Sequence, residues 1–182
     1  MPNWACGTVS ITGPKQNILK FADRFIYNEQ ADSDNKPEHR FFARSFSSYT
    51  QAGMTDEIEA LFADTKPGTE ATFSLPIDFA WSAYSCLIKG YPQDFAEECI
   101  TLSDACKLDG VSVEIQTDEP GMCFEETITC DKDGNIDAQS CEMPAYTCPH
   151  CDATHAYPSF VGLDESACYE CGEIGLTKPE VD

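Results

Sequence analysis

Residues 111–130, VSVEIQTDEPGMCFEETITC, carry the pattern that decides the fold. Apolar side chains recur at every second position in the first half and share one face in the second half, as strands with one buried face require. Asp118-Glu-Pro-Gly121 supplies turn residues between the two halves. The stretch therefore predicts an antiparallel β-hairpin. Its inward residues are Val111, Val113 and Ile115, then Met122, Phe124, Ile128 and Cys130.

The same patterns recur toward the N-terminus. Alternation predicts strands over 4–12 and 71–79, where Pro76 indicates an edge or a bulge. Apolar stripes at helical spacing predict helices after Gly13-Pro14, over 56–64 with Thr55 as cap, and over 93–107. Residues 39–50 are ambiguous, and 131–145 have the composition of a turn and a linker. This order predicts an α+β fold with helices on one face of an antiparallel sheet.

The C-terminal region carries two cysteine pairs, Cys148-Pro-His-Cys151 and Cys168-Tyr-Glu-Cys171, separated by sixteen residues. This spacing lies within the range of structural zinc sites. A C-x2-C turn lets two thiolates bind one metal from a single tight loop, and two such turns complete a tetrahedron. The sequence therefore predicts a zinc ribbon with Cys148, Cys151, Cys168 and Cys171 as ligands.

Three nearby residues are alternative ligands, and one alternative chemistry uses the same thiols. Cys141, His150 and His155 lie close enough in the sequence to replace a cysteine. Cys148 and Cys151 also have the spacing of a catalytic dithiol, which would require a helix to begin at the motif in a thioredoxin-like domain. Only 31 residues follow Cys151, so the zinc interpretation is favoured.

The chain divides into a main domain over 1–137, a linker over 138–145 and a ribbon over 146–178. A ribbon this short buries little apolar surface, so metal binding would supply much of its folding free energy and the zinc would be structural. No phosphate-binding glycine loop, G-x-S-x-G or H-E-x-x-H motif is present, which favours a non-enzymatic protein.

The acidic charge is concentrated in the last two-thirds of the chain. The net charge is −21, and residues 51–182 carry 27 Asp or Glu against five Lys or Arg. Such a field repels phosphate backbones, which disfavours nucleic acid and favours either solubility or a basic protein partner. An alternative is a surface for single-stranded nucleic acid at 39–49, the one basic and aromatic cluster. It contains His39, Arg40, Phe41, Phe42, Arg44, Phe46 and Tyr49.

Cysteine usage and hydropathy bound the compartment. Eleven cysteines, an odd number with four assigned to metal, favour a reducing cytoplasm, with most of the other seven as buried small hydrophobes. No apolar run approaches the length of a membrane span. The N-terminal residues do not show the charged segment followed by an apolar run that is typical of a secretion signal, so secretion is not expected. Residues 129–140 partly match a calcium loop but lack its first and last ligands, which favours a simple turn at Asp131.

The N-terminal residues resemble a known family. Met1-Pro2-Asn3-Trp4, then Cys6, Val9, Ile11 and Thr12-Gly13-Pro14, resemble the YubB-type ferredoxin-like family of bacterial plasmid and phage proteins. The resemblance is specific over about the first 25 residues and looser to about residue 137. It implies a ferredoxin-like sheet, an origin on a mobile element and the cytoplasm of a bacterial host. It brings no catalytic residues.

Together these features predict a non-enzymatic phage or plasmid accessory protein that acts by protein–protein contact. Its acidic surface would engage a basic host protein, as a host-takeover or counter-defence factor that imitates DNA. The alternative is a nucleic-acid-binding accessory protein that uses residues 39–49. A dithiol redox protein is the third hypothesis.

Overall fold

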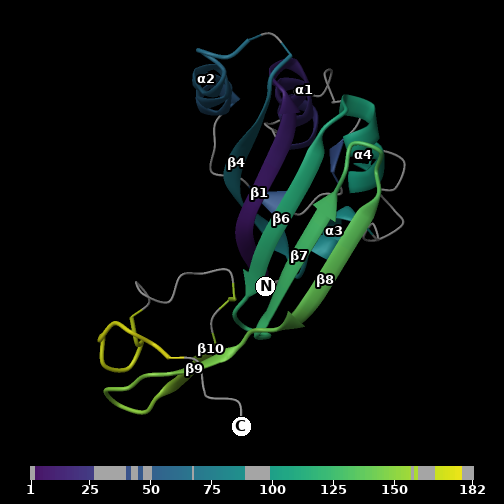
Figure 1. Cartoon of the computed structure of the whole chain (residues 1–182). Coiled ribbons are helices and arrows are strands. Elements are labelled where there is room, and N and C mark those ends of the chain that lie inside the picture. The colour runs from purple at the N-terminus through teal and green to yellow at the C-terminus, as the bar shows by residue number, and fades with distance from the viewer. Residues whose placement is uncertain are drawn as a thin grey trace.

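A computed structural model describes residues 3–26, 40–41, 45–46, 51–66, 68–88, 99–156, 158–159 and 167–177. One long sheet forms its frame, with the helices toward one end and a small C-terminal ribbon beyond the other (Figure 1). The α+β class is therefore confirmed. Among the described residues, no helix is both long enough and apolar enough to cross a membrane.

The described part of the main sheet has the strand order β3-β4-β1-β6-β7-β8, and each neighbouring pair is antiparallel. A separate short parallel pair joins β2 (Arg40–Phe41) to β5 (Cys99–Ile100). The strands of the main sheet are β1 (Trp4–Pro14), β3 (Ser45–Phe46), β4 (Glu70–Ala80), β6 (Ser112–Glu119), β7 (Phe124–Cys130) and β8 (Ile136–Glu142).

The predicted hairpin is confirmed as β6 and β7. Ile115 lies opposite Ile128 in the register, and both side chains are buried. The turn occupies 120–123, slightly later than predicted, because the Glu119 carboxylate accepts the backbone N–H groups of Gly121 at 3.1 Å and Met122 at 2.5 Å. The Met122 side chain is consequently exposed at the turn rather than inward.

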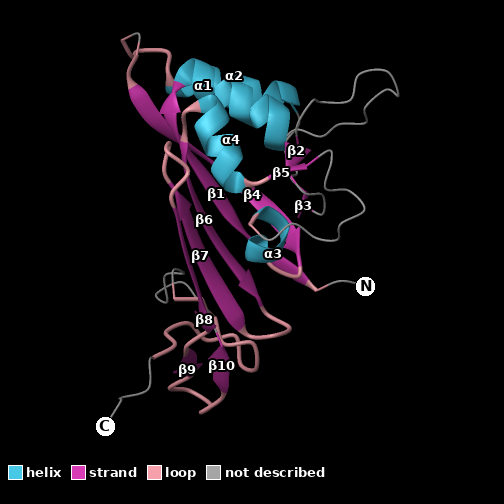
Figure 2. Ribbon diagram, turned by 90° about the vertical axis from the view of Figure 1, so that its right-hand side faces the viewer, coloured by secondary structure: helices cyan, strands magenta, loops and turns pink. Residues whose placement is uncertain are grey.

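Within the described residues, helices α1 to α4 lie on one face of the sheet, and the opposite face carries no helix (Figure 2). The core forms between the helices and the apolar side of the strands, where the predicted residues Phe73, Leu75, Ile77 and Phe79 are all buried. The helices are α1 (Lys15–Phe21), continued by the π-helical turn η1 (Ala22–Ile26), then α2 (Gln51–Leu61), α3 (Ala83–Leu87) and α4 (Leu102–Asp109).

Two predicted helices have different bounds in the structure. Helix α2 begins before the predicted residue 56, so Thr55 lies inside it rather than at its cap. Helix α4 begins at Leu102, because the Thr101 hydroxyl accepts the backbone N–H of Asp104 and caps the helix there. It ends at Gly110, whose φ of 65° suits glycine. The predicted residues 93–98 lie outside the described part.

The prediction of a turn and linker over 131–145 is correct only at its start. Asp131 organises a turn, accepting backbone N–H groups of Asp133 and Asn135 at 2.9 Å each, as the simple-turn interpretation requires. Residues 136–142, which overlap the expected linker 138–145, instead form β8. Only Ile136 in β8 is even half-buried, so the strand has no alternating apolar signal in its sequence.

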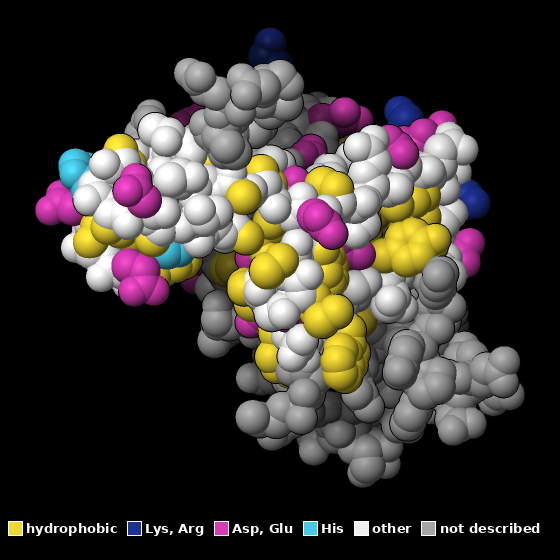
Figure 3. Space-filling view, turned by 90° about the horizontal axis from the view of Figure 1, so that it is seen from below, with side chains coloured by type: hydrophobic (Ala, Val, Ile, Leu, Met, Phe, Trp, Pro, Cys, Tyr) yellow, Lys and Arg dark blue, Asp and Glu magenta, His cyan; other side chains and the backbone are white. Residues whose placement is uncertain are grey.

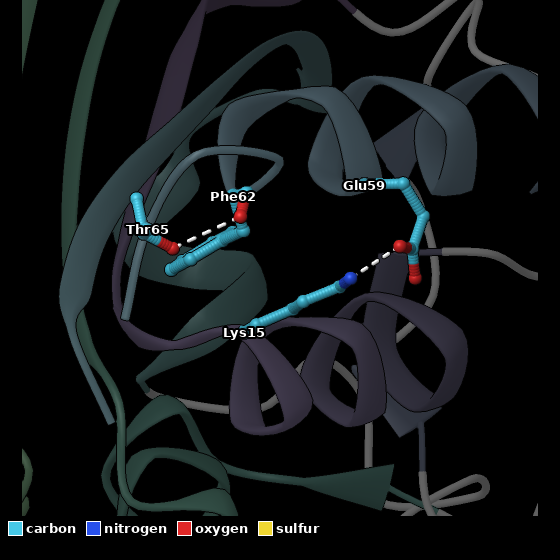
Figure 4. Close-up of polar contacts among 4 residues, drawn as sticks. All are labelled: Lys15, Glu59, Phe62 and Thr65. Atoms are coloured by element: carbon cyan, nitrogen blue, oxygen red, sulfur yellow. Dashed lines mark hydrogen bonds and ion pairs between the residues drawn. The ribbon is translucent and has the colours of Figure 1, made fainter. Parts of the chain in front are cut away.

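A surface ion pair joins the first two helices. Lys15 Nζ on α1 contacts Glu59 Oε2 on α2, and Thr65 donates to the backbone carbonyl of Phe62 at the end of α2 at 3.0 Å (Figure 4). Because both charged side chains are substantially exposed, the pair contributes about 0–1 kcal/mol to stability. The buried Ile58 and Phe62 therefore hold α2 more strongly than this ion pair does.

Asp109 is a buried carboxylate at an unfavourable place. Its side chain is 2% exposed, Oδ1 lies 3.6 Å from Arg24 Nη1, and Oδ2 has no hydrogen-bond partner within the described structure. It closes the C-terminal turn of α4, where the helix dipole opposes negative charge. Burial raises the pKa of Asp109, and the nearby Arg24 and Lys20 only partly offset that effect.

Asp109→Asn is expected to stabilise the protein by about 1 kcal/mol at pH 7. Because the folded-state pKa is raised, the folded chain holds more protons than the unfolded chain above pH 3.8, and stability falls as pH rises through the folded pKa. The variant should lose this component of the pH dependence. Urea unfolding at several pH values checks it, with exposed Asp64→Asn as the control. A destabilised variant at pH 7 would show that the Arg24 contact outweighs burial.

Candidate metal centre

The C-terminal ribbon is built from short strands that hold two turns against each other. Strand β9 (Ala145–Thr147) pairs with β10 (Thr154–Ala156), and the first cysteine turn lies between them. Bridges at Thr147–Thr177 and Ala167–Ile174 bring the second turn alongside. The ribbon lies beyond the end of the main sheet, away from α1 and α2 (Figure 1).

The four predicted cysteines come together in one cluster. Their Sγ atoms all lie within 4.8 Å of one another, with Cys148 3.7 Å from Cys171 and Cys151 3.6 Å from Cys168. Four sulfurs at about 2.3 Å from one tetrahedral metal would be about 3.8 Å apart, whereas a disulfide would bring two of them to about 2.05 Å. The described geometry therefore fits four thiolates around one metal ion.

The two turns are equivalent in their backbone geometry. The fourth residue after each leading cysteine donates its N–H back to that cysteine's carbonyl, from Asp152 to Cys148 at 2.9 Å and from Gly172 to Cys168 at 2.8 Å. Both donors are left-handed, with φ of 57° and 77°. In each turn the leading cysteine is buried and the second is exposed. Each turn therefore presents one thiol from inside the ribbon and one from its surface.

Cys168 has the most favourable surroundings for a thiolate. Burial raises its pKa, but backbone N–H groups of Cys171 and Glu170 and the side chains of His155 and Cys151 together lower the pKa to about 6. His155 Nε2 lies 3.1 Å from Cys168 Sγ, and its ring packs edge-on against Tyr169 with centroids 5.3 Å apart. His155 is therefore placed to support a ligand thiolate from outside the four-sulfur cluster.

The other candidate ligands lie elsewhere. Cys141 is on β8, with Sγ 3.4 Å from Glu125 Oε1, and it is not part of the four-sulfur cluster. His150 is exposed in the first turn. Of the other predicted buried cysteines, Cys86, Cys106 and Cys130 are buried, and Cys6, Cys123 and Cys141 are exposed. The side chain of Cys99 lies outside the described part.

The described part of the ribbon has a very small apolar core. The described members of its buried cluster are Tyr146, Leu176 and the two leading cysteines, with Ala153 packed against them. Burying two such apolar side chains contributes only about 3–6 kcal/mol, less than the conformational entropy of ordering the segment. A metal ion bound by the four sulfurs would supply the missing stabilisation.

One sheet residue ties the ribbon to the main sheet. Glu125 on β7 accepts hydrogen bonds from the backbone N–H and the hydroxyl of Ser159, each at 2.5 Å. Glu125 is 7% exposed although its side chain belongs to the face of the sheet that carries no helices. The sequence gives no sign of this contact, because a lone serine after the first turn has no distinguishing pattern.

The helix-free face of the sheet is acidic and rich in hydroxyl groups. Register places six carboxylates on it and, among the described residues, no Lys or Arg. Hydroxyl pairs continue across it, with Ser10 and Ser74 2.8 Å apart and Thr12 and Thr72 also 2.8 Å apart. The carboxylates are Glu70, Asp78, Glu114, Asp118, Glu125 and Asp137. This face is called the acidic face below.

The carboxylates of the acidic face influence one another. Burial raises the pKa of Asp118, and the neighbouring Glu125 and Glu119 raise it further. At the ribbon end of the molecule, acidic side chains also surround a central group of hydrophobic ones, and the Lys and Arg visible there lie at the rim (Figure 3). A cationic partner would relieve this mutual repulsion.

The basic and aromatic cluster at 39–49 lies largely outside the described residues, which include only the backbone of 40–41 and 45–46 from it. No protein-family model, curated protein or solved structure matches the chain.

Proposed function

We propose that the protein is a non-enzymatic binding protein whose acidic face engages a basic protein, with a structural zinc ion in the ribbon. The observation that carries the proposal is the distribution of charge. Six carboxylates share one helix-free sheet face that has no described Lys or Arg. If the acidic residues served only solubility, they would be spread over all surfaces alike.

The assignment of zinc rests on the donor set. Four thiolates at tetrahedral spacing suit Zn²⁺ or an iron centre. The closed arrangement leaves no ligand position for substrate, which favours a structural role. Cys148 and Cys151 lie in a turn between β9 and β10, whereas a catalytic dithiol would begin a helix.

The strand order supports a ferredoxin-like origin. In β3-β4-β1-β6, α1 lies in the connection between β1 and β3, and α4 lies between β4 and β6. A split βαβ arrangement has this order. Strands β7 and β8 would then extend the domain at one edge. Together with the resemblance of the first 25 residues, this order favours a phage or plasmid protein of a bacterial cytoplasm, acting as a host-takeover or counter-defence factor.

Neutralising carboxylates of the acidic face should weaken partner binding, and neutralising other acids should not. We expect Glu70→Gln with Glu114→Gln and Asp137→Asn to weaken capture of a basic host protein by about tenfold at low salt. The matched control is Asp56→Asn with Glu57→Gln and Asp64→Asn, which changes the net charge equally but alters exposed acids in and after α2.

The measurement is affinity capture from bacterial lysate on the immobilised full chain, quantified by mass spectrometry across a salt series. A basic protein that moderate salt releases, that the control captures as the wild type does and that the acidic-face variant captures about tenfold less well supports the proposal. Equal capture by both variants would overturn it. Retention of single-stranded DNA instead would favour the nucleic-acid alternative at 39–49.

A further inference from the structure

We propose that β8 is a docking edge for an extended basic segment of the partner, which would add a strand to the sheet. The inference rests on the proposed function, because it specifies how the acidic face would hold a basic protein. Adding a strand uses main-chain hydrogen bonds for affinity and pockets for alternate side chains for specificity. The structure offers both features along β8.

Strand β8 is the outermost strand of the described sheet, and no other described strand pairs with its outer side. It pairs with β7 in an unbroken register from Ile136–Cys130 to Glu142–Phe124, so it contains no bulge, and it includes neither Lys nor Pro. Its residues 138–142 are all exposed. Sheet edges in natural proteins are normally blocked by a bulge, by Lys or Pro residues, or by a covering segment.

The opposite edge of the same sheet differs. Strand β4 carries Pro76, which cannot donate to a further strand, and β3 pairs with β4 at Phe79 and Asp78. Among the described residues, one edge is therefore blocked in the usual way, and no strand pairs with the outer side of the other along its seven residues. This asymmetry directs strand addition to β8.

A hollow on the acidic face lies beside the start of β8. Its volume is about 410 Å³, and Glu114, Thr129, Asp131 and Asp137 are among the residues that line it, with no Lys or Arg. A Lys or Arg side chain from an added strand would reach carboxylates there. The hollow therefore favours a basic residue at the position of the added strand that faces it.

A second hollow lies toward the helix side of β8. Its volume is about 350 Å³, and its lining includes Tyr84 of α3, Ile128 of β7, and Ala138 and Ser140 of β8. Glu126 also lines it and is held by the backbone N–H of Ala83 at 2.8 Å. Because successive side chains of a strand point to opposite faces, an added strand would place apolar residues here and basic residues on the acidic face.

A second copy of this chain fits the edge poorly. Each copy carries a net charge of −21, and pairing two β8 strands would bring together Asp137 and Glu142 from both chains. Like charges on paired strands are destabilising. A basic partner removes that repulsion, so charge complementarity selects it over self-association.

The test uses a synthetic probe against the full chain. The acetylated and amidated peptide Lys-Val-Lys-Val-Lys-Val-Lys matches the predicted alternation, and a version with every backbone nitrogen methylated keeps its charge but cannot donate along either edge. NMR titration and hydrogen exchange of labelled protein at low salt measure both. We expect the first peptide to protect the outward β8 amides, which are those that do not bond to β7, and to bind at least tenfold more tightly than the methylated one.

The possible results separate the two proposals. If both peptides bind equally and the outward β8 amides stay unprotected, strand addition is wrong, but the acidic face still binds cations. If neither peptide binds, the inference fails and the acidic-face proposal loses its support as well. If β8 amides are protected without peptide in a concentration-dependent dimer, the edge belongs to a second copy and the inference is overturned.

Discussion

Replacing Cys148 with serine will remove the metal ion and unfold the ribbon, while the main sheet stays folded. Cys148 is fully buried, and it is both a proposed ligand and a member of the small apolar cluster in the described part of the ribbon. Structural zinc contributes about 10–16 kcal/mol of apparent binding free energy in small ribbons, far more than so small a core. Wild-type protein purified without chelator should hold one zinc ion, and the variant should hold none.

The measurements are elemental analysis, thiol titration and an NMR spectrum of the labelled chain. In the wild type, four thiols should resist modification until a chelator is added. Cys123→Ser alters an exposed cysteine outside the cluster and should change neither metal content nor spectrum beyond its neighbours. If the protein holds iron in place of zinc, the proposed identity of the metal is wrong but the proposed site stands. Metal-free wild-type protein with an oxidised Cys148–Cys151 pair would overturn the proposed metal site and favour the redox hypothesis.

The second large effect is expected at Gly7 in the middle of β1. A Cβ added there would lie 1.9 Å from the backbone oxygen of Gln116 and 2.7 Å from Thr117 Cα. Both atoms belong to the backbone of β6, which cannot move aside without losing its pairing with β1. Gly7→Ala should therefore destabilise the protein by about 3 kcal/mol or more.

Urea unfolding gives the free energy, and Gly13→Ala is the matched control. Gly13 lies on the same strand and the same face, but a Cβ there would meet only the Val111 side chain at 3.1 Å, with backbone atoms at 3.7 Å. The control should cost about 1 kcal/mol or less. Equal effects at both positions would show that β1 and β6 approach less closely than described.

The sequence predicted the parts of the fold that bury a regular apolar face. Ile115 and Ile128 in the hairpin and Phe73 in β4 follow the two-residue period, and burial confirms them. Strand β8 was missed because almost all of its side chains face water, so only its pairing with β7 reveals it. The start of α4 was predicted too early because the apolar spacing of the sequence continues back to Cys99. In the structure the helix begins only at Leu102, since Thr101 is its N-cap.

The candidate site also has parts that the sequence predicts and parts that depend on the folded structure. The four cysteines were predictable because two turns of one spacing must each present two thiols, and the structure places the four sulfurs together. The supporting contact of His155 with Cys168 and the contact of Ser159 with Glu125 depend on tertiary placement. The acid excess was visible in the composition, but its location on one face required the strand register.

The equivalence of the two cysteine turns has a consequence for the order of assembly. Each turn closes through hydrogen bonds within five residues, from Cys148 N–H to Ala153 and from Cys168 N–H to Glu173, so each half can form locally before the other. One half would capture the ion first. Only the loop of sixteen residues between the halves would then have to close, and its entropic cost grows slowly with length. Metal loading should therefore be fast and should tolerate inserted residues between Cys151 and Cys168.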